Sequence, residues 1–167
     1  MTIAHHYTSE SILRLFNLER NGLVPYRRLE MLNPDEQGDK FIFAFMEKRP
    51  SSWIKNSKFP GVWTHLMKHM SHGDFSIYRC SFEVSPRDAT FVVDWAHMER
   101  VRKEINKSNI FSAGKEDLER IKEANKRYIA SKTPLSEYKG GFSLPELIIA
   151  SPISGDRLKV EEYNPTN

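Results

Sequence analysis

Near its C-terminal end the chain reads SLPELII over residues 143–149, and this stretch is the most informative part of the sequence for the fold. A glycine pair, Gly140 and Gly141, precedes it, and a proline-isoleucine segment at 152–153 follows it. The apolar run after Glu146 predicts a buried strand over residues 146–150. A single carboxylate at the start of a buried strand is a candidate for stabilising positive charge that develops on a substrate.

A second motif, HHYTS over residues 5–9, lies at the other end of the chain. Residues 3–7 are expected to form a short strand. Ser9 is a suitable N-cap for a helix that should continue through the apolar positions 12–18 and end at Asn21-Gly22. The motif therefore places imidazoles and small hydroxyls at a strand.

The remaining patterns predict an α+β fold. Residues 76–84 alternate as a half-buried strand does, and residues 41–46 are apolar on both faces, which is typical of a central strand. Further strands are expected at 89–94 and 157–163, an irregular or helical stretch at 50–70, helices at 95–106 and 115–131, and a loop at 33–40. This order favours one domain over residues 1–167, with a split mixed or antiparallel β-sheet and flanking helices.

The composition is that of a globular protein, since 39% of its 167 residues are hydrophobic and 28% are charged. The only cysteine, Cys80, excludes an intramolecular disulfide, and its apolar surroundings predict a core position. No apolar run reaches the length of a membrane span, and the N-terminus lacks a signal-peptide pattern. We expect a cytoplasmic protein, either in the producing cell or in a target cell after delivery.

Taken together, the two terminal motifs resemble the ADP-ribosyltransferase fold, in the bacterial toxin or effector form with a His-x-Thr…Glu pattern. The resemblance implies NAD as co-substrate and Glu146 as the catalytic carboxylate. It also implies that His6 binds the ribose, that the Tyr7 backbone holds the nicotinamide amide, and that Thr8 supplies a hydroxyl. Tyr7 replaces the glycine usual in this family, and His5 competes with His6 for the place of the histidine.

The same resemblance assigns the other contacts with NAD. The pair Arg27-Arg28 follows the first helix, and guanidinium groups suit the pyrophosphate. The family uses an aromatic residue, often Tyr, to stack on the nicotinamide. Here Phe43 or Phe45 takes that part, with Trp53 on the following loop.

The resemblance therefore implies an NAD-dependent ADP-ribosyltransferase that modifies a macromolecular acceptor, either protein or nucleic acid. A toxin of this kind would have a partner protein that neutralises it. The alternative is a catalytically inactive module of the same fold that binds protein or nucleic acid. Its nucleic-acid contacts would come from cations in the two late helices: Lys103, Lys107, Lys115, Lys122, Lys126 and Arg127.

A rival signal is the histidine cluster His65, His69 and His72, whose spacing is compatible with metal ligands on one helix face. The sequence offers no clear fourth ligand and no general-base Glu between the imidazoles. We therefore expect no metal. Asp94 ends the strand predicted at 89–94, directly before the helix predicted at 95–106, and is interpreted as a cap of that helix rather than as a partner of His97.

Overall fold

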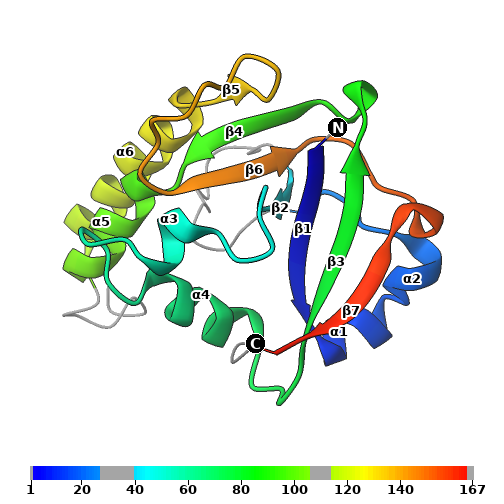
Figure 1. The fold of residues 1–167 in the computed structure, drawn as a ribbon. Coiled ribbons are helices and arrows are strands. Elements are labelled where there is room, and N and C mark those ends of the chain that lie inside the picture. The colour runs from blue at the N-terminus through cyan, green and yellow to red at the C-terminus, as the bar shows by residue number, and fades with distance from the viewer. Residues whose placement is uncertain (1, 27–39, 106–113, 165–167) are drawn as a thin grey trace.

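The computed structural model describes residues 2–26, 40–105 and 114–164 (Figure 1). The predictions for Arg27 and Arg28, and nearly all of the predicted loop 33–40, lie outside these residues. The described part contains α1 (Glu10–Leu15), α2 (Leu18–Asn21), α3 (Ser51–Ile54), α4 (Val62–Met70), α5 (Ala96–Ile105) and α6 (Lys115–Ala130). Its strands are β1 (Thr2–Ser9), β2 (Ile42–Ala44), β3 (Ile77–Val84), β4 (Thr90–Asp94), β5 (Thr133–Pro134), β6 (Pro145–Ile149) and β7 (Lys159–Tyr163).

The strands form two antiparallel sheets, with the orders β1-β3-β7 and β2-β6-β4-β5 (Figure 1). An isolated bridge between His5 and Phe45 joins β1 to the end of β2. The sheet that contains β1 therefore meets the other sheet at β2. Strand β2 lies between β1 and β6. The predicted α+β class is confirmed, and every strand pair in the described part is antiparallel.

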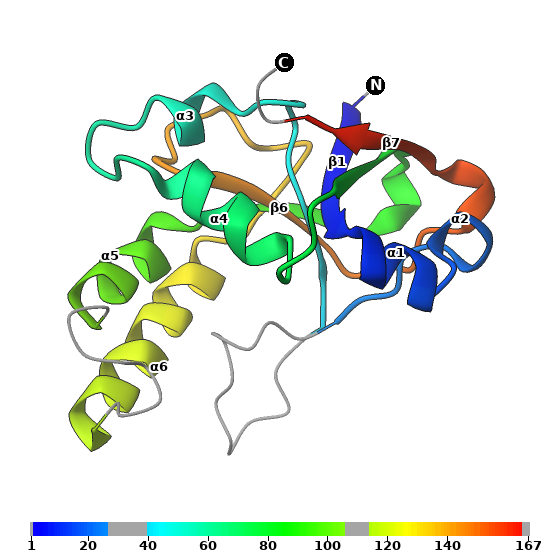
Figure 2. The same ribbon diagram turned by 90° about the horizontal axis from the view of Figure 1, so that it is seen from below.

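Two apolar clusters hold these layers together. The first covers one face of β2, β6 and β4 with helices α3 to α6, and it is rich in aromatic side chains, including Trp53 and Trp63. Figure 2 shows α5 and α6 side by side across this region, away from α1 and α2. The second cluster combines residues of both sheets, among them Ala4, Cys80 and Leu147. Cys80 is fully buried, as predicted, and burial raises the pKa of its thiol to about 12.

The single helix predicted after Ser9 is wrong, because two short helices take its place. Ser9 caps α1 by accepting a hydrogen bond from the Ile12 N–H, as expected. Asn17 then adopts a left-handed conformation (φ 47°), which asparagine tolerates better than most residues, and α2 begins after it. Gly22 ends α2 with φ 81°, and a Cβ atom there would lie 2.0 Å from the Ile153 carbonyl oxygen.

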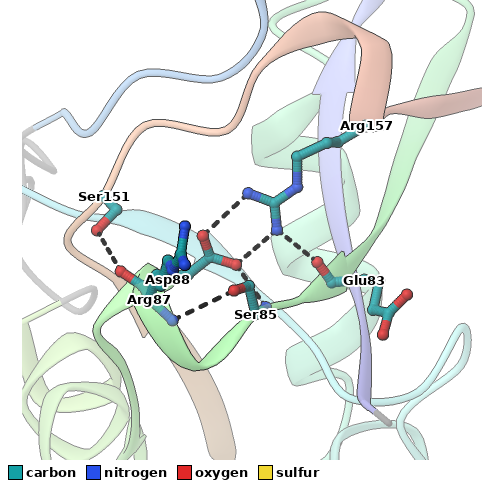
Figure 3. A network of polar contacts seen from close by, with 6 residues as sticks. All are labelled: Glu83, Ser85, Arg87, Asp88, Ser151 and Arg157. Atoms are coloured by element: carbon teal, nitrogen blue, oxygen red, sulfur yellow. Dashed lines mark hydrogen bonds and ion pairs between the residues drawn. The ribbon is translucent and has the colours of Figure 1, made fainter.

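A polar network fixes the segments around the outer ends of β3, β4 and β7 (Figure 3). Arg157, in the 3-10 turn Gly155–Arg157, donates two hydrogen bonds of 2.9 and 2.6 Å to the Asp88 carboxylate and one of 2.7 Å to the Glu83 carbonyl. The same carboxylate accepts from the Ser85 N–H at 2.6 Å. Arg157 thereby lowers the pKa of Asp88. The predicted strand at 157–163 consequently starts at Lys159.

None of the helices in the described part of the chain is both long and apolar enough to cross a membrane.

Candidate active site

The junction of β1 and β2 is the place where the two sheets meet and then separate. His5 and Phe45 exchange two backbone hydrogen bonds of 2.9 Å. Four residues away on the same edge of β2, Phe41 exchanges two backbone hydrogen bonds of 3.0 Å with Tyr26 rather than with β1. Between these bridges, Tyr7 on β1 and Phe43 on β2 would continue the ladder. We call this stretch the β1–β2 break.

The Tyr7 backbone points into the β1–β2 break. The N–H and C=O groups of one strand residue share an edge, and this edge alternates along the strand. His5 uses its groups toward β2, and Glu10 donates toward β3 at Ser76, so Tyr7 directs its groups toward β2 as well. Among the described residues, neither group of Tyr7 has a backbone hydrogen-bond partner there. Tyr7 is only 1% exposed, so an unmet peptide donor and acceptor lie in a buried place.

The imidazole of His6 reaches across the break to β2. Its Nδ1 donates to the Phe43 carbonyl oxygen at 2.7 Å, and this fixes the tautomer because a carbonyl can only accept. The hydrogen bond replaces the ladder bond that the Tyr7 N–H would otherwise make to Phe43. The His6 ring also meets the Tyr26 ring edge-on, with centroids 6.4 Å apart. These two contacts hold the His6 ring beside Phe43 and Tyr26.

The two predicted stacking residues have different surroundings. Phe43 lies 5.3 Å from Tyr26, centroid to centroid, next to the break. Phe45 is packed among aromatic rings, 5.0 Å from Trp53 and 5.2 Å from Trp63. Tyr26 is 37% exposed and was not singled out from the sequence, because only the bridge to Phe41 brings it to this place.

The Tyr7 side chain belongs to the same aromatic group as Phe45. Its ring lies 5.4 Å from Trp63 and 5.0 Å from Tyr163, in both cases edge-on, and its hydroxyl donates to the Lys48 carbonyl. Burial raises the pKa of this hydroxyl to about 12. A glycine at this position would leave a large hole in the aromatic cluster, which gives Tyr7 a structural reason to be present.

Alternation along β1 divides the HHYTS motif between two faces. His5 and Tyr7 share the face of Phe45, whereas His6 and Thr8 face the other side. Thr8 is 4% exposed. His5 Nδ1 lies 2.8 Å from the Ser81 hydroxyl, and burial, followed by the nearby charges of Arg79 and Lys48, lowers its pKa to about 4.

Glu146 lies inside β6, a strand with neighbours on both sides. Its backbone partner is Val93 on β4, and continuing the β2–β6 register places Phe45 on its other side. Its side chain is fully buried and accepts a 2.9 Å hydrogen bond from the hydroxyl of Tyr128 on α6. The Glu146 side chain therefore lies on the same face as His5 and Tyr7, with β2 between β6 and β1. His6 and Thr8 lie on the opposite face.

The segment leading into β6 is tightly held. The Asp94 carboxylate accepts hydrogen bonds from the N–H groups of Ser143 at 3.2 Å and Leu144 at 2.9 Å. It also accepts from the Ala96 N–H at 3.1 Å, which confirms its predicted part as a cap of α5. Trp53 Nε1 donates to the Pro145 carbonyl at 2.9 Å. The position of Glu146 thus depends on contacts from β4 and α3.

Comparison of the chain with protein-family models, with curated proteins and with solved structures found no match.

The basic helices offer a weaker nucleic-acid surface than their sequence indicated. On α6, Lys122 pairs with Glu119 at 3.1 Å and Arg127 with Glu123 at 3.2 Å. On α5, Lys103 lies over the Phe59 ring, 5.2 Å from its centroid, and donates to the Lys58 carbonyl. Lys107 is outside the described residues. Several of these cations are thus already used within the protein.

The histidine cluster is not assembled as a metal centre in the part of the chain that the structure covers. His65 and His69 lie on α4, but His72 follows the end of that helix with a left-handed backbone (φ 49°). The His69 and His72 rings are 6.1 Å apart. Across residues 2–26, 40–105 and 114–164, no group of three or more His, Cys, Asp or Glu could hold a metal ion.

Proposed function

We propose that the chain is an NAD-dependent ADP-ribosyltransferase of the bacterial toxin or effector kind, with the ADP-ribosyltransferase fold. The observation that carries the proposal is the unmet peptide N–H and C=O of Tyr7 in the β1–β2 break, next to the His6 imidazole. The strands form two sheets, as the expected split β-sheet requires, and this also supports the proposal.

The Tyr7 backbone has the chemistry to recognise a primary carboxamide. Such a group carries one acceptor and two donors in a plane, and a strand edge offers one donor and one acceptor in the complementary arrangement. A buried peptide unit left without partners costs about 1–3 kcal/mol per group, and a bound carboxamide would remove that cost. Nicotinamide presents such a carboxamide.

The other contacts follow from the residues around the break. His6 and Thr8 share one face of β1, so an imidazole and a hydroxyl would bind the ribose from the same side. Phe43 is better situated than Phe45 to stack on the nicotinamide, because it borders the break and Phe45 is enclosed by Trp53 and Trp63. Arg27 and Arg28 keep their proposed role toward the pyrophosphate.

The proposed reaction breaks the bond between the ribose C1′ and the nicotinamide nitrogen. Nicotinamide leaves with the electron pair, the ribose becomes cation-like, and a nucleophile of the acceptor forms the new bond to C1′ and loses a proton. Glu146 would stabilise the positive charge on the ribose. Because Glu146 shares the face of Tyr7 and not that of His6 and Thr8, this role requires the ribose C1′ to reach the Tyr7 face of the sheet. It also requires the Glu146 carboxylate to become accessible, so its contact with Tyr128 on α6 has to open or be shared during turnover.

Nicotinamide release from NAD in the presence of cell lysate tests the proposal, followed by protease or nuclease digestion of labelled product to separate protein from nucleic-acid acceptors. We expect turnover by the wild type and its loss in Glu146→Gln. Glu99→Gln is the matched control, because Glu99 is 1% exposed but pairs with Arg102 on its own helix. Absence of turnover in every lysate, or equal turnover by the wild type and Glu146→Gln, would contradict it.

A second candidate is an inactive module of the same fold, and the burial of Glu146 favours it. A module of this kind would bind NAD or a macromolecule without releasing nicotinamide. Binding of NAD that depends on His6 but leaves NAD intact over long incubation would support the module over the enzyme. A neutralising partner protein is proposed only for the enzyme, since an inactive module needs none.

A further inference from the structure

A surface pocket lies on the face of β1, β3 and β7 that carries the Tyr7 side chain. Arg49, Arg79, Glu162, Tyr163 and Asn164 line it. Two guanidinium groups thus come together from segments far apart in sequence, since Arg49 follows β2 and Arg79 lies within β3. The lining includes Tyr163, whose ring packs against the Tyr7 ring, but none of the residues that form the β1–β2 break.

Arg79 retains hydrogen-bonding capacity in this pocket. Its Nη2 donates to Glu161 at 2.7 Å, and its side chain is 14% exposed. Lys159 pairs with the other oxygen of Glu161 at 2.8 Å, so this carboxylate is shared by two cations and neutralises only one charge. In the part of the chain that the structure describes, the buried Nε of Arg79 has no hydrogen-bond partner.

The surrounding charges make the pocket electropositive. The lining itself carries the two cations Arg49 and Arg79 against the single carboxylate Glu162. Beside it, Glu161 is paired with both Arg79 and Lys159. Glu162 is also engaged, because it accepts a 2.8 Å hydrogen bond from the Ser76 hydroxyl. The depressed pKa of His5 agrees with this field, since Arg79 and Lys48 are among its causes after burial.

We propose that this pocket binds the phosphate groups of a ligand, with Arg49 and Arg79 as the principal contacts. Two separate guanidinium forks match a diphosphate better than a single carboxylate, because each fork can take oxygens of one phosphoryl group. The inference goes beyond the proposed function and does not require turnover of NAD. Since the proposed function already gives the NAD pyrophosphate to Arg27 and Arg28, the ligand that we infer here is a second phosphorylated molecule, and binding of NAD in this pocket is an outcome that the test distinguishes.

Calorimetric titration of the full chain with inorganic pyrophosphate tests the pocket. We expect binding by the wild type and a loss of about tenfold or more in affinity for Arg79→Gln and for Arg49→Gln. Glu161→Gln should bind more tightly, because it removes the carboxylate that competes for Arg79. Arg120→Gln is the control, since Arg120 lies on α6 in ion pairs with Glu104 and Asp117.

Parallel titrations with ADP and NAD identify the source of the phosphate. Parallel weakening of NAD binding in the arginine variants assigns the pocket to the co-substrate. Unchanged NAD binding, with pyrophosphate and ADP binding lost, assigns it to another phosphorylated ligand. No binding of pyrophosphate, ADP or NAD to the wild type overturns the inference, as does equal binding by all variants with wild-type melting temperatures. Failure of nicotinamide release alone would overturn the proposed enzyme and leave the pocket intact.

Discussion

The two halves of the candidate site, β1 and β6, differ in how their polar groups are satisfied. On β1, the Tyr7 peptide faces a break in the ladder, and the His6 side chain takes the hydrogen bond that a neighbouring strand would have supplied. On β6, the backbone is paired with β2 and β4, and the Glu146 carboxylate is enclosed and bonded to Tyr128. The β1 half leaves backbone groups that a ligand would bind in the proposed function, whereas the β6 half is built into the core.

The two kinds of polar group affect the stability of the protein in different ways. Unmet groups at a strand edge lower stability locally, and a ligand can restore it. A buried carboxylate is costly unless its partners are in place, and here α6 supplies one of them. Variants in β6 should therefore affect folding first, and variants in β1 should affect ligand binding first.

The largest effect is expected for Glu146→Ala. This change leaves the Tyr128 hydroxyl without its partner and creates a cavity in the aromatic cluster, so we expect a loss of about 3–4 kcal/mol in the free energy of unfolding. Urea denaturation followed by circular dichroism measures it. A loss below about 1 kcal/mol would show that Glu146 is less embedded than the structure indicates.

A pH effect of roughly 3 kcal/mol is expected from His5. Its pKa is about 4 in the folded protein and 6.5 in the unfolded chain, so the unfolded state binds more protons between these values. Stability should be fully present above pH 6.5 and fall as the pH decreases toward 4. His5→Gln should flatten this part of the curve. His65, whose pKa is also lowered by burial, contributes in the same direction, so His65→Gln is measured alongside.

Tyr128→Phe is expected to cost about 1–2 kcal/mol, because it deletes the donor to a fully buried carboxylate without opening a cavity. Tyr78→Phe is a matched control on a half-buried tyrosine of β3. Thermal unfolding of both variants compares them. If both substitutions lowered stability equally, the hydrogen bond between Tyr128 and Glu146 would contribute no more than a half-buried hydroxyl does. The proposed difference between β6 and β1 would then be wrong.

The smallest effect on stability is expected for His6→Gln, at about 1 kcal/mol or less, because glutamine can still donate to the Phe43 carbonyl. The same variant should weaken NAD binding in the proposed function. Unfolding and calorimetry on one preparation separate the two effects. A large loss of stability with unchanged NAD binding would make His6 a structural residue.

Local sequence patterns predicted most strands of this fold. The alternation at 76–84 predicted a half-buried strand, and β3 confirms it. The apolar run at 41–46 predicted a central strand, but β2 covers only Ile42–Ala44 and is the end strand of its sheet, where the single bridge from Phe45 to His5 and the apolar cluster bury its other side. The break of the first helix at Asn17 was missed, because a left-handed residue inside an apolar helical pattern has no periodic signature. Strand β5 was missed as well, since two residues are too few to form a pattern.

The site was harder to predict, because it depends on contacts between distant segments. The environment of Glu146 could have been inferred from Ile148, which lies two residues along β6 and shares its buried face. Nothing local indicated that Tyr26 pairs with Phe41, or that Tyr128 on α6 reaches Glu146. Arg49 and Arg79 likewise line one pocket only because the fold brings the segment after β2 next to β3.

The Asp94 carboxylate also fixes the register of β6 against β4. It binds the N–H groups of Ser143 and Leu144 just before β6 and starts α5 with the Ala96 N–H. A slip of β6 by one residue against β4 would lose these bonds and turn every side chain of the strand to the other face. Asp94 therefore determines that Glu146 faces α6 and Leu147 faces the opposite cluster. One side chain outside the candidate site thus decides on which side of the sheet its carboxylate lies.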